Sequence, residues 1–295
     1  MVIKKAILPI AGLGTRFLPL SKIFPKEVWP LVDKPVIQYL VEEAKNSGIS
    51  EIIFVISPEK KAVVDYFQKY YLQKSPKIEK KLREQGKVNL LEELKKMEEL
   101  CQGLSFNFVF QKKPLGDGHA ILQAKDLVKD EPVAVLFGDD IVESKTPCLA
   151  QLIKVFKTAQ KPVIALSQVS KEKVSSYGIV GIEKIANRLF KIKKIVEKPA
   201  IDKAPSDLAI VGKYILTPEV FDYLKKAKPS KKGEIILAEV FEEMIGDGKV
   251  IYGYQFEGNW LECGTKEGWL ECHFYLTLKH PKYGLRLREY LKKIK

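Results

Sequence analysis

Apolar and polar residues along this chain follow two alternating patterns. The first is a short, nearly continuous apolar run of strand length, such as the one from Ala6 to Ala11, which is typical of a strand covered on both faces. The second is a stripe with helical spacing that begins after Pro35, stops at Gly48 and consists of Val36, Ile37, Leu40, Val41 and Ala44. Alternation of the two patterns predicts a protein in which strands and helices follow one another.

The two patterns locate the elements along the whole chain. Strands are predicted at residues 6–11, 51–57, 106–111, 133–137, 163–168, 179–182, 192–197, 210–216 and 250–256. Helices are predicted at residues 35–48, 62–71, 77–99, 120–127, 149–157, 218–226, 235–245, 268–278 and about 285–293.

This order of elements predicts an α/β fold with an open, Rossmann-like central sheet that is mixed but mainly parallel, with helices on both of its faces. The later strands are joined by short loops, which predicts an antiparallel extension folded over one edge of that sheet. The chain shows no Ser/Gly linker and no internal repeat. We therefore expect one domain over residues 1–295, with a helical insertion at about 70–103 and a C-terminal helical segment at about 268–295.

Composition excludes several classes of protein. An apolar content of 46% and a charged content of 29% are ordinary for a soluble globular protein, and no apolar stretch approaches the roughly 20 residues of a membrane span. Lys4 and Lys5 precede an apolar run as in a signal peptide, but the run is short and contains Pro9, so we expect a cytoplasmic protein. The four scattered cysteines lack metal-site spacing and are expected to be reduced thiols.

The net charge of +13, from 50 basic and 37 acidic residues, permits nucleic-acid binding but equally suits a site for phosphorylated small molecules. The Lys-rich stretch 74–96 also carries acidic residues, so it is read as a solvated helical face and not as a basic stripe. We expect no nucleic-acid partner.

The loop after the first strand carries the residue types of a phosphate site. Gly12 and Gly14 form a tight Gly-X-Gly turn, in which backbone N–H groups can point at an anion. Arg16 and Lys26 add positive charges suited to phosphate oxygens. The dinucleotide fingerprint is excluded because Phe17 stands at its third glycine position, and the P-loop word is absent. A plain strand-to-turn connection remains the alternative for the loop on its own.

The complete sequence motif decides between a phosphate site and a plain strand-to-turn connection. G-L-G-T-R, then P-K-E, then P-L-V-D-K-P resembles the signature of sugar-1-phosphate nucleotidyltransferases, and within them most closely that of bacterial UTP–glucose-1-phosphate uridylyltransferases. The helical insertion is typical of this group and usually lacking in thymidylyltransferase relatives. The resemblance implies a nucleotide-diphospho-sugar transferase fold with a sugar-side extension, and nucleotide contacts from Ala11, Gly12, Gly14 and Thr15.

Two acidic residues end the apolar strand in the word LFGDDI. Carboxylates at the carboxyl edge of a sheet suit Mg²⁺, which takes one or two of them together with phosphates and waters. A turn acid that caps the next helix is the alternative. The resemblance implies that Asp139 is a metal ligand and that Asp140 orients the loop or contacts the ribose of the nucleotide.

The segment QKKPLGDGHA holds the residues expected around the base. Gln111 carries a donor and an acceptor that can recognise the edge of a pyrimidine, and it matches a family position that contacts the base. Gly116 and Gly118 match the family's loop against the nucleotide, where a helix begins. His119 is more readily structural than catalytic, because a phosphate oxygen that attacks needs no proton removed.

Three later sequence motifs resemble those that bind the sugar in this family. SYGIV supplies Gly178, whose backbone would approach the sugar, and IVEKP supplies Glu197 for the sugar hydroxyls and Lys198 for the attacking phosphate. VGKYIL would line the sugar side through Val211, Gly212 and Lys213.

Two positions depart from the family pattern on the sugar side. Glu262, in NWLECGT, stands where the family usually has the Asp that completes the Mg²⁺ site, and Glu239 stands where relatives often have Asp. The extra methylene of Glu262 matters at ligand distances of about 2.1 Å. These departures leave the sugar substrate more open than the reaction.

The resemblance implies transfer of a uridylyl group from UTP to glucose 1-phosphate with Mg²⁺ as cofactor, by a homodimer or homotetramer. Arg16, Lys26 and Lys198 would neutralise phosphate charge. The alternatives are the same chemistry with dTTP or another hexose 1-phosphate, and, more distantly, a non-catalytic binder of nucleotides or nucleic acid.

Overall fold

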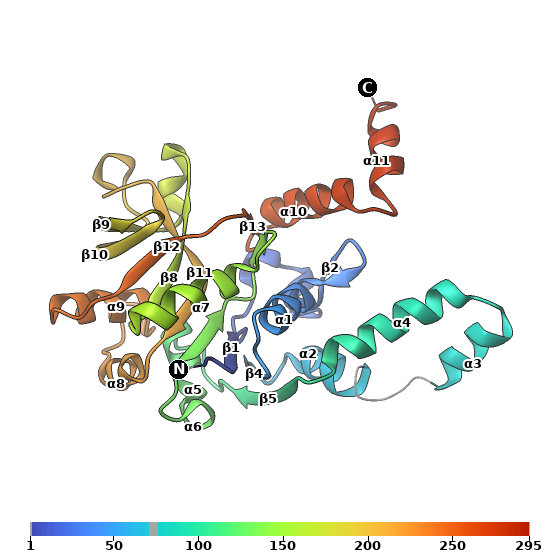
Figure 1. The fold of residues 1–295 in the computed structure, drawn as a ribbon, viewed down its shortest axis with the longest axis horizontal. Helices are drawn as coiled ribbons and strands as arrows, with labels where there is room; N and C mark the ends of the chain where they lie inside the picture. The colour runs from blue at the N-terminus through green and yellow to red at the C-terminus, as the bar shows by residue number, and fades with distance from the viewer. Residues whose placement is uncertain (1, 71–75, 295) are drawn as a thin grey trace.

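A computed structural model describes residues 2–70 and 76–294 of the chain (Figure 1). Its centre is a nine-stranded sheet with the strand order β5-β4-β1-β6-β11-β8-β12-β10-β9. In chain order these strands are β1 (Lys5–Pro9), β4 (Glu51–Ile56), β5 (Ser105–Phe110), β6 (Val133–Leu136), β8 (Val163–Gln168), β9 (Gly178–Ala186), β10 (Leu189–Glu197), β11 (Leu208–Leu216) and β12 (Tyr252–Gln255). Each lies where the apolar runs predict a strand.

The sheet is mixed in direction. Strands β5, β4, β1 and β6 are parallel neighbours, and β12 is parallel to β8. Strand β11 runs antiparallel to both of its neighbours, and β10 does the same. The predicted mixed sheet is confirmed, but parallel pairing is limited to the N-terminal half and one later pair, so the sheet is not mainly parallel.

The later strands curl back on themselves. Strand β9 pairs with β10 and also meets β11, where Ala209 lies opposite Ile179. The five strands from β11 to β9 therefore close into a ring through this one additional pairing. This is how the predicted antiparallel extension is built: it continues the main sheet and does not form a separate one.

Helices cover both faces of the sheet. On one face α1 (Val36–Asn46) and α7 (Cys148–Ala159) pack on the alternate β1 residues Ala6 and Leu8. On the other face α5 (Asp117–Gln123), α6 (Lys125–Val128), α8 (Pro218–Lys226) and α9 (Leu237–Gly246) share a cluster with Ile7. Strand β1 is thus buried on both sides, as its uninterrupted apolar run predicts.

The predicted insertion consists of two helices, α3 (Pro76–Glu84) and α4 (Val88–Cys101), which form an arm that projects from the sheet (Figure 1). One helix over 77–99 was expected, but the chain turns at Gly86, whose φ of 62° is a left-handed conformation. The helix predicted at 62–71 is α2 (Lys61–Asp65) followed by a π-helical turn (Tyr66–Tyr70); residue 71 lies outside the described residues.

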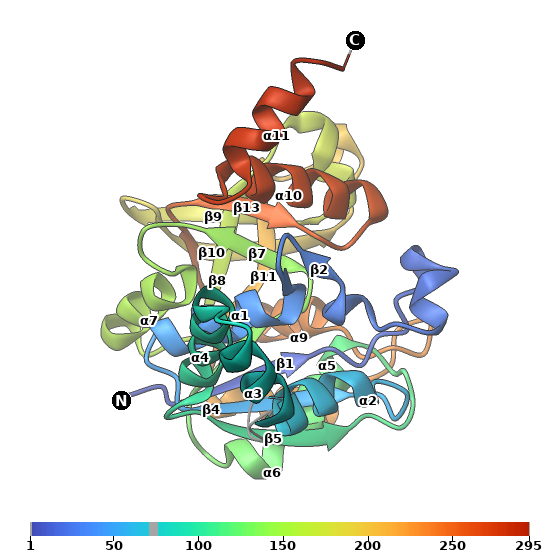
Figure 2. The same ribbon diagram turned by 90° about the vertical axis from the view of Figure 1, so that its right-hand side faces the viewer.

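The C-terminal segment is helical, as predicted, with α10 (Lys266–Lys279) and α11 (Gly284–Leu291). Figure 2 shows both at one end of the molecule, above the sheet. Trp269 and Tyr275 of α10 pack in a small cluster with Cys272, whereas Phe274 is 48% exposed.

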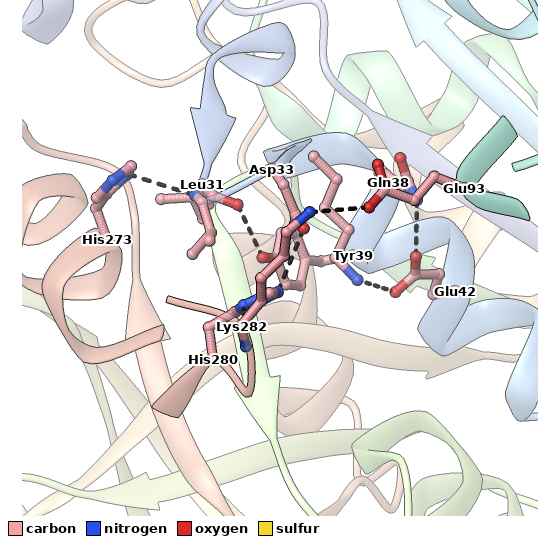
Figure 3. A network of polar contacts seen from close by, with 11 residues as sticks. Leu31, Asp33, Gln38, Tyr39, Glu42, Glu93, His273, His280 and Lys282 are labelled. Carbon is pink, nitrogen blue, oxygen red and sulfur yellow. Dashed lines mark hydrogen bonds and ion pairs between the residues drawn. The ribbon is translucent and has the colours of Figure 1, made fainter. Parts of the chain in front are cut away.

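A polar network joins this segment to the arm and to the loop of the short hairpin β2 (Pro30–Leu31) and β3 (Lys34–Pro35) (Figure 3). His280 Nε2 lies 3.3 Å from Asp33 Oδ2, and Lys282 Nζ lies 3.2 Å from Glu93 Oε1 of α4. The network thus ties three distant parts of the sequence together.

Besides β2 and β3, two further strands escaped sequence analysis. Strands β7 (Asp140–Glu143) and β13 (Asn259–Glu262) pair antiparallel in a small separate sheet, with Glu262 opposite Asp140. Neither is a continuous apolar run, so the pattern gave no signal for them. In the described part of the chain, no helix has the length and apolar character needed to cross a membrane.

Candidate active site

The chain leaves β1, β5 and β6 at the same edge of the sheet, because these parallel strands point the same way. The Gly12 loop follows β1, Gln111 follows β5, and Asp139 follows β6. A cavity of about 410 Å³ opens there, a size suited to a small ligand. Of the residues predicted from the sequence, it is lined by Ala11, Gly12, Thr15, Lys26, Gln111, Gly116 and Asp139.

Lys26 and Asp139 meet in this cavity. Lys26 begins the short 3₁₀ helix Lys26–Val28, and its Nζ lies 2.6 Å from Asp139 Oδ2. Burial raises the pKa of Asp139, but the charges of Lys26 and Arg16 outweigh it and hold that pKa below its ordinary value. Burial likewise lowers the pKa of Lys26, and Asp139 and Glu27 more than offset it, so the net shift is upward. Both groups are therefore charged at neutral pH.

The pairing of β7 with β13 brings Glu262 to the same place. A Cβ atom on Gly264 would lie 2.5 Å from Glu262 Oε1, 3.0 Å from Asp139 Oδ2 and 3.5 Å from Arg16 Nη1. The two carboxylates and the guanidinium therefore surround one point, and only glycine leaves that point open. Burial and then the charge of Asp139 raise the pKa of Glu262. Gly14, in left-handed conformation with φ 65°, directly precedes the short 3₁₀ helix Thr15–Phe17 that carries Arg16.

This donor set fits Mg²⁺. Asp139 and Glu262 offer hard carboxylate oxygens toward one point, and Mg²⁺ is usually held by one or two carboxylates while phosphates and waters fill its other positions. Among the described residues, no group of three or more His, Cys, Asp or Glu side chains is placed to hold a metal ion. The arrangement thus suits a metal shared with a phosphorylated ligand.

Asp140 faces inward and not into the cavity. Its Oδ1 accepts a hydrogen bond from Trp260 Nε1 at 2.6 Å, and its Oδ2 accepts one from the Gly212 N–H at 3.1 Å. Burial, followed by the charge of Asp139, raises its pKa to about 7. Of the two roles expected for Asp140, the geometry supports orientation of the loop, with Gly212 as part of the frame that holds it.

Gln111 is buried, with an exposed fraction of only 5%. Its Nε2 donates to the carbonyl oxygen of Gly116 at 3.0 Å and lies 2.8 Å from His119 Nδ1. Gly118 is also buried; its N–H donates to Ile235 O at 2.9 Å and to Asp117 Oδ1 at 2.6 Å. Gly118 thus anchors the start of α5 and does not line the cavity.

Three residues predicted for the sugar side, Gly178, Glu197 and Lys198, lie close together. Gly178 and Glu197 are paired across β9 and β10, and a Cβ on Gly178 would lie 3.1 Å from Glu197 Oε2. Lys198 Nζ lies 3.5 Å from Glu197 Oε1, and both side chains are about half exposed. Gly178, Glu197 and Lys198 are not among the described residues that line the cavity, so their place beside the sugar phosphate stays a prediction.

Lys213 and Val211 correct the prediction for the sugar side. Both side chains are 0% exposed. Lys213 forms an ion pair with Glu43 of α1 at 2.7 Å, and Val211 packs in the core between the sheet and the helices. Strand β11 is a central strand, so these side chains enter the core and not a ligand site.

Sequence analysis missed Glu27, which lines the cavity directly behind Lys26. Its side chain is buried, its Oε1 accepts a hydrogen bond from Lys60 Nζ at 2.7 Å, and its Oε2 accepts none from the described residues. The sequence did contain a signal for Glu27: in the P-K-E motif it directly follows Lys26, a predicted phosphate ligand. Asp117 was missed as well.

Comparison with known proteins identifies the family of the chain. The family model described as nucleotidyl transferase matches residues 5–277. The chain belongs to the nucleotidyl transferase family. Within it, the chain is 42% identical over 294 residues to UTP–glucose-1-phosphate uridylyltransferase 1 of Staphylococcus saprophyticus, which covers 100% of this chain and 99% of that protein.

Solved structures of the family share the fold. UDP-glucose pyrophosphorylase from Acinetobacter baumannii is similar with a TM-score of 0.88 and 34% identity, over 100% of both chains. A UDP-glucose pyrophosphorylase solved with UDP-glucose is similar with a TM-score of 0.83 and 37% identity, over 95% of this chain and 100% of that one. These nucleotidyl transferases match the mixed α/β architecture described above.

Proposed function

We propose that this nucleotidyl transferase transfers the uridylyl group of UTP to glucose 1-phosphate, giving UDP-glucose and pyrophosphate. The observation that carries the proposal is the convergence of Arg16, Lys26, Asp139 and Glu262 beside a cavity lined by Gln111. Relatives with 42% identity over the full length bear the name of this activity, and a similar structure was solved with UDP-glucose.

The chemistry is an in-line displacement at the α-phosphorus of UTP. An oxygen of the sugar phosphate forms the new P–O bond while the bond to the β-phosphate breaks, and pyrophosphate leaves with the bonding electrons. No base is needed, because the attacking oxygen already carries negative charge. Catalysis is then a matter of position and charge neutralisation.

The chain supplies these effects through named residues. Arg16 and Lys26 bind the triphosphate, Gln111 and Gly116 contact the base, and Lys198 binds the phosphate of the sugar, with Glu197 and Gly178 beside the hexose. Asp139 and Glu262 would hold Mg²⁺, which neutralises phosphate charge when bound. Asp140 and Gly212 keep the Asp139 loop in place.

A pyrophosphate-release assay over UTP, dTTP, CTP, ATP and GTP, each with several hexose 1-phosphates, tests the proposal. UTP with glucose 1-phosphate should give the highest kcat/KM. Preference for dTTP or another hexose would keep the reaction and change the substrate. Salt-sensitive binding of nucleic acid without turnover would overturn it, and the Asp139→Asn variant serves as the inactive control.

We also propose that the chain works as a homodimer or homotetramer in the cytoplasm. Exposed apolar side chains on α10 and α11 support self-association: Leu270, Phe274, Leu285, Tyr290 and Leu291 are each at least 38% exposed. Light scattering measures the assembly directly, and a monomer at all concentrations would exclude it.

A further inference from the structure

The amide of Gln111 has a defined orientation. Its nitrogen lies 3.0 Å from the carbonyl oxygen of Gly116 and 2.8 Å from His119 Nδ1. A carbonyl oxygen only accepts hydrogen bonds, so the end of the amide beside Gly116 must be the NH₂ group. The first N–H therefore goes to Gly116, and the second is directed at His119.

This geometry fixes the state of His119 as well. Because the Gln111 nitrogen donates, Nδ1 of His119 must be the unprotonated, accepting nitrogen of the ring. Burial lowers the pKa of His119, which keeps the imidazole neutral at pH 7. On the far side of the ring, Gln123 Nε2 lies 3.2 Å from His119 Nε2. A neutral imidazole has one accepting nitrogen, and the shorter contact, that of Gln111 at 2.8 Å, takes it, so Nε2 carries the proton and forms no hydrogen bond with the Gln123 nitrogen.

The remaining polar atom of Gln111 is its acceptor, Oε1. No described residue donates a hydrogen bond to it, although Gln111 is 95% buried and lines the cavity. An acceptor in this position pairs with an N–H on a ligand. Uracil and thymine carry a hydrogen at N3, whereas the N3 of cytosine is itself an acceptor and would face Oε1 with two lone pairs opposed.

We infer that His119 is a positioning residue for selection of the base: by accepting from the Gln111 amide nitrogen, it keeps Oε1 toward the cavity and thereby favours a nucleotide with an N3–H over a cytidine nucleotide. The inference rests on the proposed function, since it assumes that Gln111 contacts the base. Gly116 alone does not fix the amide as firmly, because without the second acceptor the side chain is free to turn.

The test compares two substitutions of nearly equal shape. In His119→Asn, Oδ1 is bonded to Cγ as Nδ1 is in histidine, so an acceptor remains near Gln111. In His119→Leu the acceptor is lost and the volume is kept. For each, kcat/KM is measured with UTP and with CTP, with glucose 1-phosphate saturating, and thermal unfolding is recorded. Asp126→Asn, on an exposed position of α6, is the control.

The ratio of kcat/KM for UTP to that for CTP should fall about tenfold or more in His119→Leu and stay within about threefold of the wild type in His119→Asn. A purely structural histidine would lower both values together and leave the ratio unchanged. An unchanged ratio in His119→Leu, or an equal fall in both variants, overturns the inference. His119→Phe, which keeps a ring without an acceptor, repeats the test if the leucine variant fails to fold.

The two proposals fail in different ways. Absence of turnover by the wild-type chain with any nucleotide and hexose 1-phosphate rejects the proposed function. Wild-type turnover of UTP together with an unaltered UTP/CTP ratio in the leucine and phenylalanine variants rejects only the role of His119.

Discussion

The Nζ atom of Lys26 lies 2.6 Å from Oδ2 of Asp139, a residue 113 positions further along the chain. The proposed metal ligand is thus engaged by a cation of the protein itself. A divalent ion that binds to the free chain must displace this ammonium, whereas a triphosphate offers Lys26 another partner. We therefore expect Lys26 and Mg²⁺ to compete for this oxygen of Asp139 until the nucleotide binds.

Replacing Lys26 with methionine should separate the competition of Lys26 with Mg²⁺ from its contact with the triphosphate. Without nucleotide, Mg²⁺ should bind about tenfold tighter, equivalent to ~1.4 kcal/mol, because the competing ammonium is gone. Turnover should nevertheless fall by about 10²–10³ through loss of the phosphate contact. Calorimetric titration with Mg²⁺ alone gives the first value, and unchanged or weaker Mg²⁺ binding would disprove the competition.

Glu262 should share in metal binding despite its extra methylene. Glu262→Gln keeps the oxygen that accepts from the Gly264 N–H at 3.1 Å and removes the charge, so the Mg²⁺ concentration for half-maximal activity should rise about tenfold. Glu262→Asp retains the charge and should stay within about threefold of the wild type. Identical Mg²⁺ dependence of Glu262→Gln and the wild type would remove this residue from the metal site.

Lys198 should act on the sugar phosphate and not on UTP. Lys198→Ala should raise the KM for glucose 1-phosphate and lower kcat by about 10²–10³, with the KM for UTP little changed. Lys193, a half-exposed lysine on strand β10, which ends directly before Lys198, supplies the control Lys193→Ala. Steady-state kinetics of Lys198→Ala that match those of the control would refute the role assigned to Lys198.

Asp117 should make the chain less stable as the pH rises. Burial raises the pKa of Asp117 to about 6, against the opposing hydrogen bonds from Leu237 and Gly118. In the unfolded chain that pKa is about 3.9. Between these values the folded state binds more protons, so stability falls as the pH rises from about 4 to about 6, by on the order of 3 kcal/mol in total.

Asp117→Asn should abolish this dependence and be more stable than the wild type above pH 7. Urea unfolding at pH 4.5 and 7.5 measures the difference, which should be larger at pH 7.5. Asp126→Asn, at an exposed position, is the matched control. A difference between wild type and Asp117→Asn that does not change with pH would contradict the assignment.

Lys213 should matter for stability and not for binding of the sugar. Removing one partner of a buried ion pair leaves an uncompensated charge, so Lys213→Met should cost about 3–5 kcal/mol. Adding Glu43→Gln, which keeps an acceptor for the Leu149 N–H at 2.9 Å, should recover much of that loss. Urea unfolding and the KM for glucose 1-phosphate are the measurements. A raised KM with unchanged stability would return Lys213 to the sugar side.

The strands of the main sheet could be predicted because their residues are apolar regardless of what they contact. β8 and α8 have the bounds that their patterns predict. Strand directions were less predictable, since apolar runs do not show which way a strand points. The break between α3 and α4 at Gly86 was missed because the residues on both sides of it have helical spacing.

The sequence by itself determined the α/β class, the Gly12 loop, and the position of Asp139 at the end of a strand, because these depend on short stretches of chain. Only the tertiary structure decided which side chains share a site. Pairing of β7 with β13 brings Glu262 to Asp139, whereas the central position of β11 directs Lys213 into the core. The physical reason is that a side chain's partners are set by the register and direction of strands far apart in sequence, which no local pattern of residues encodes.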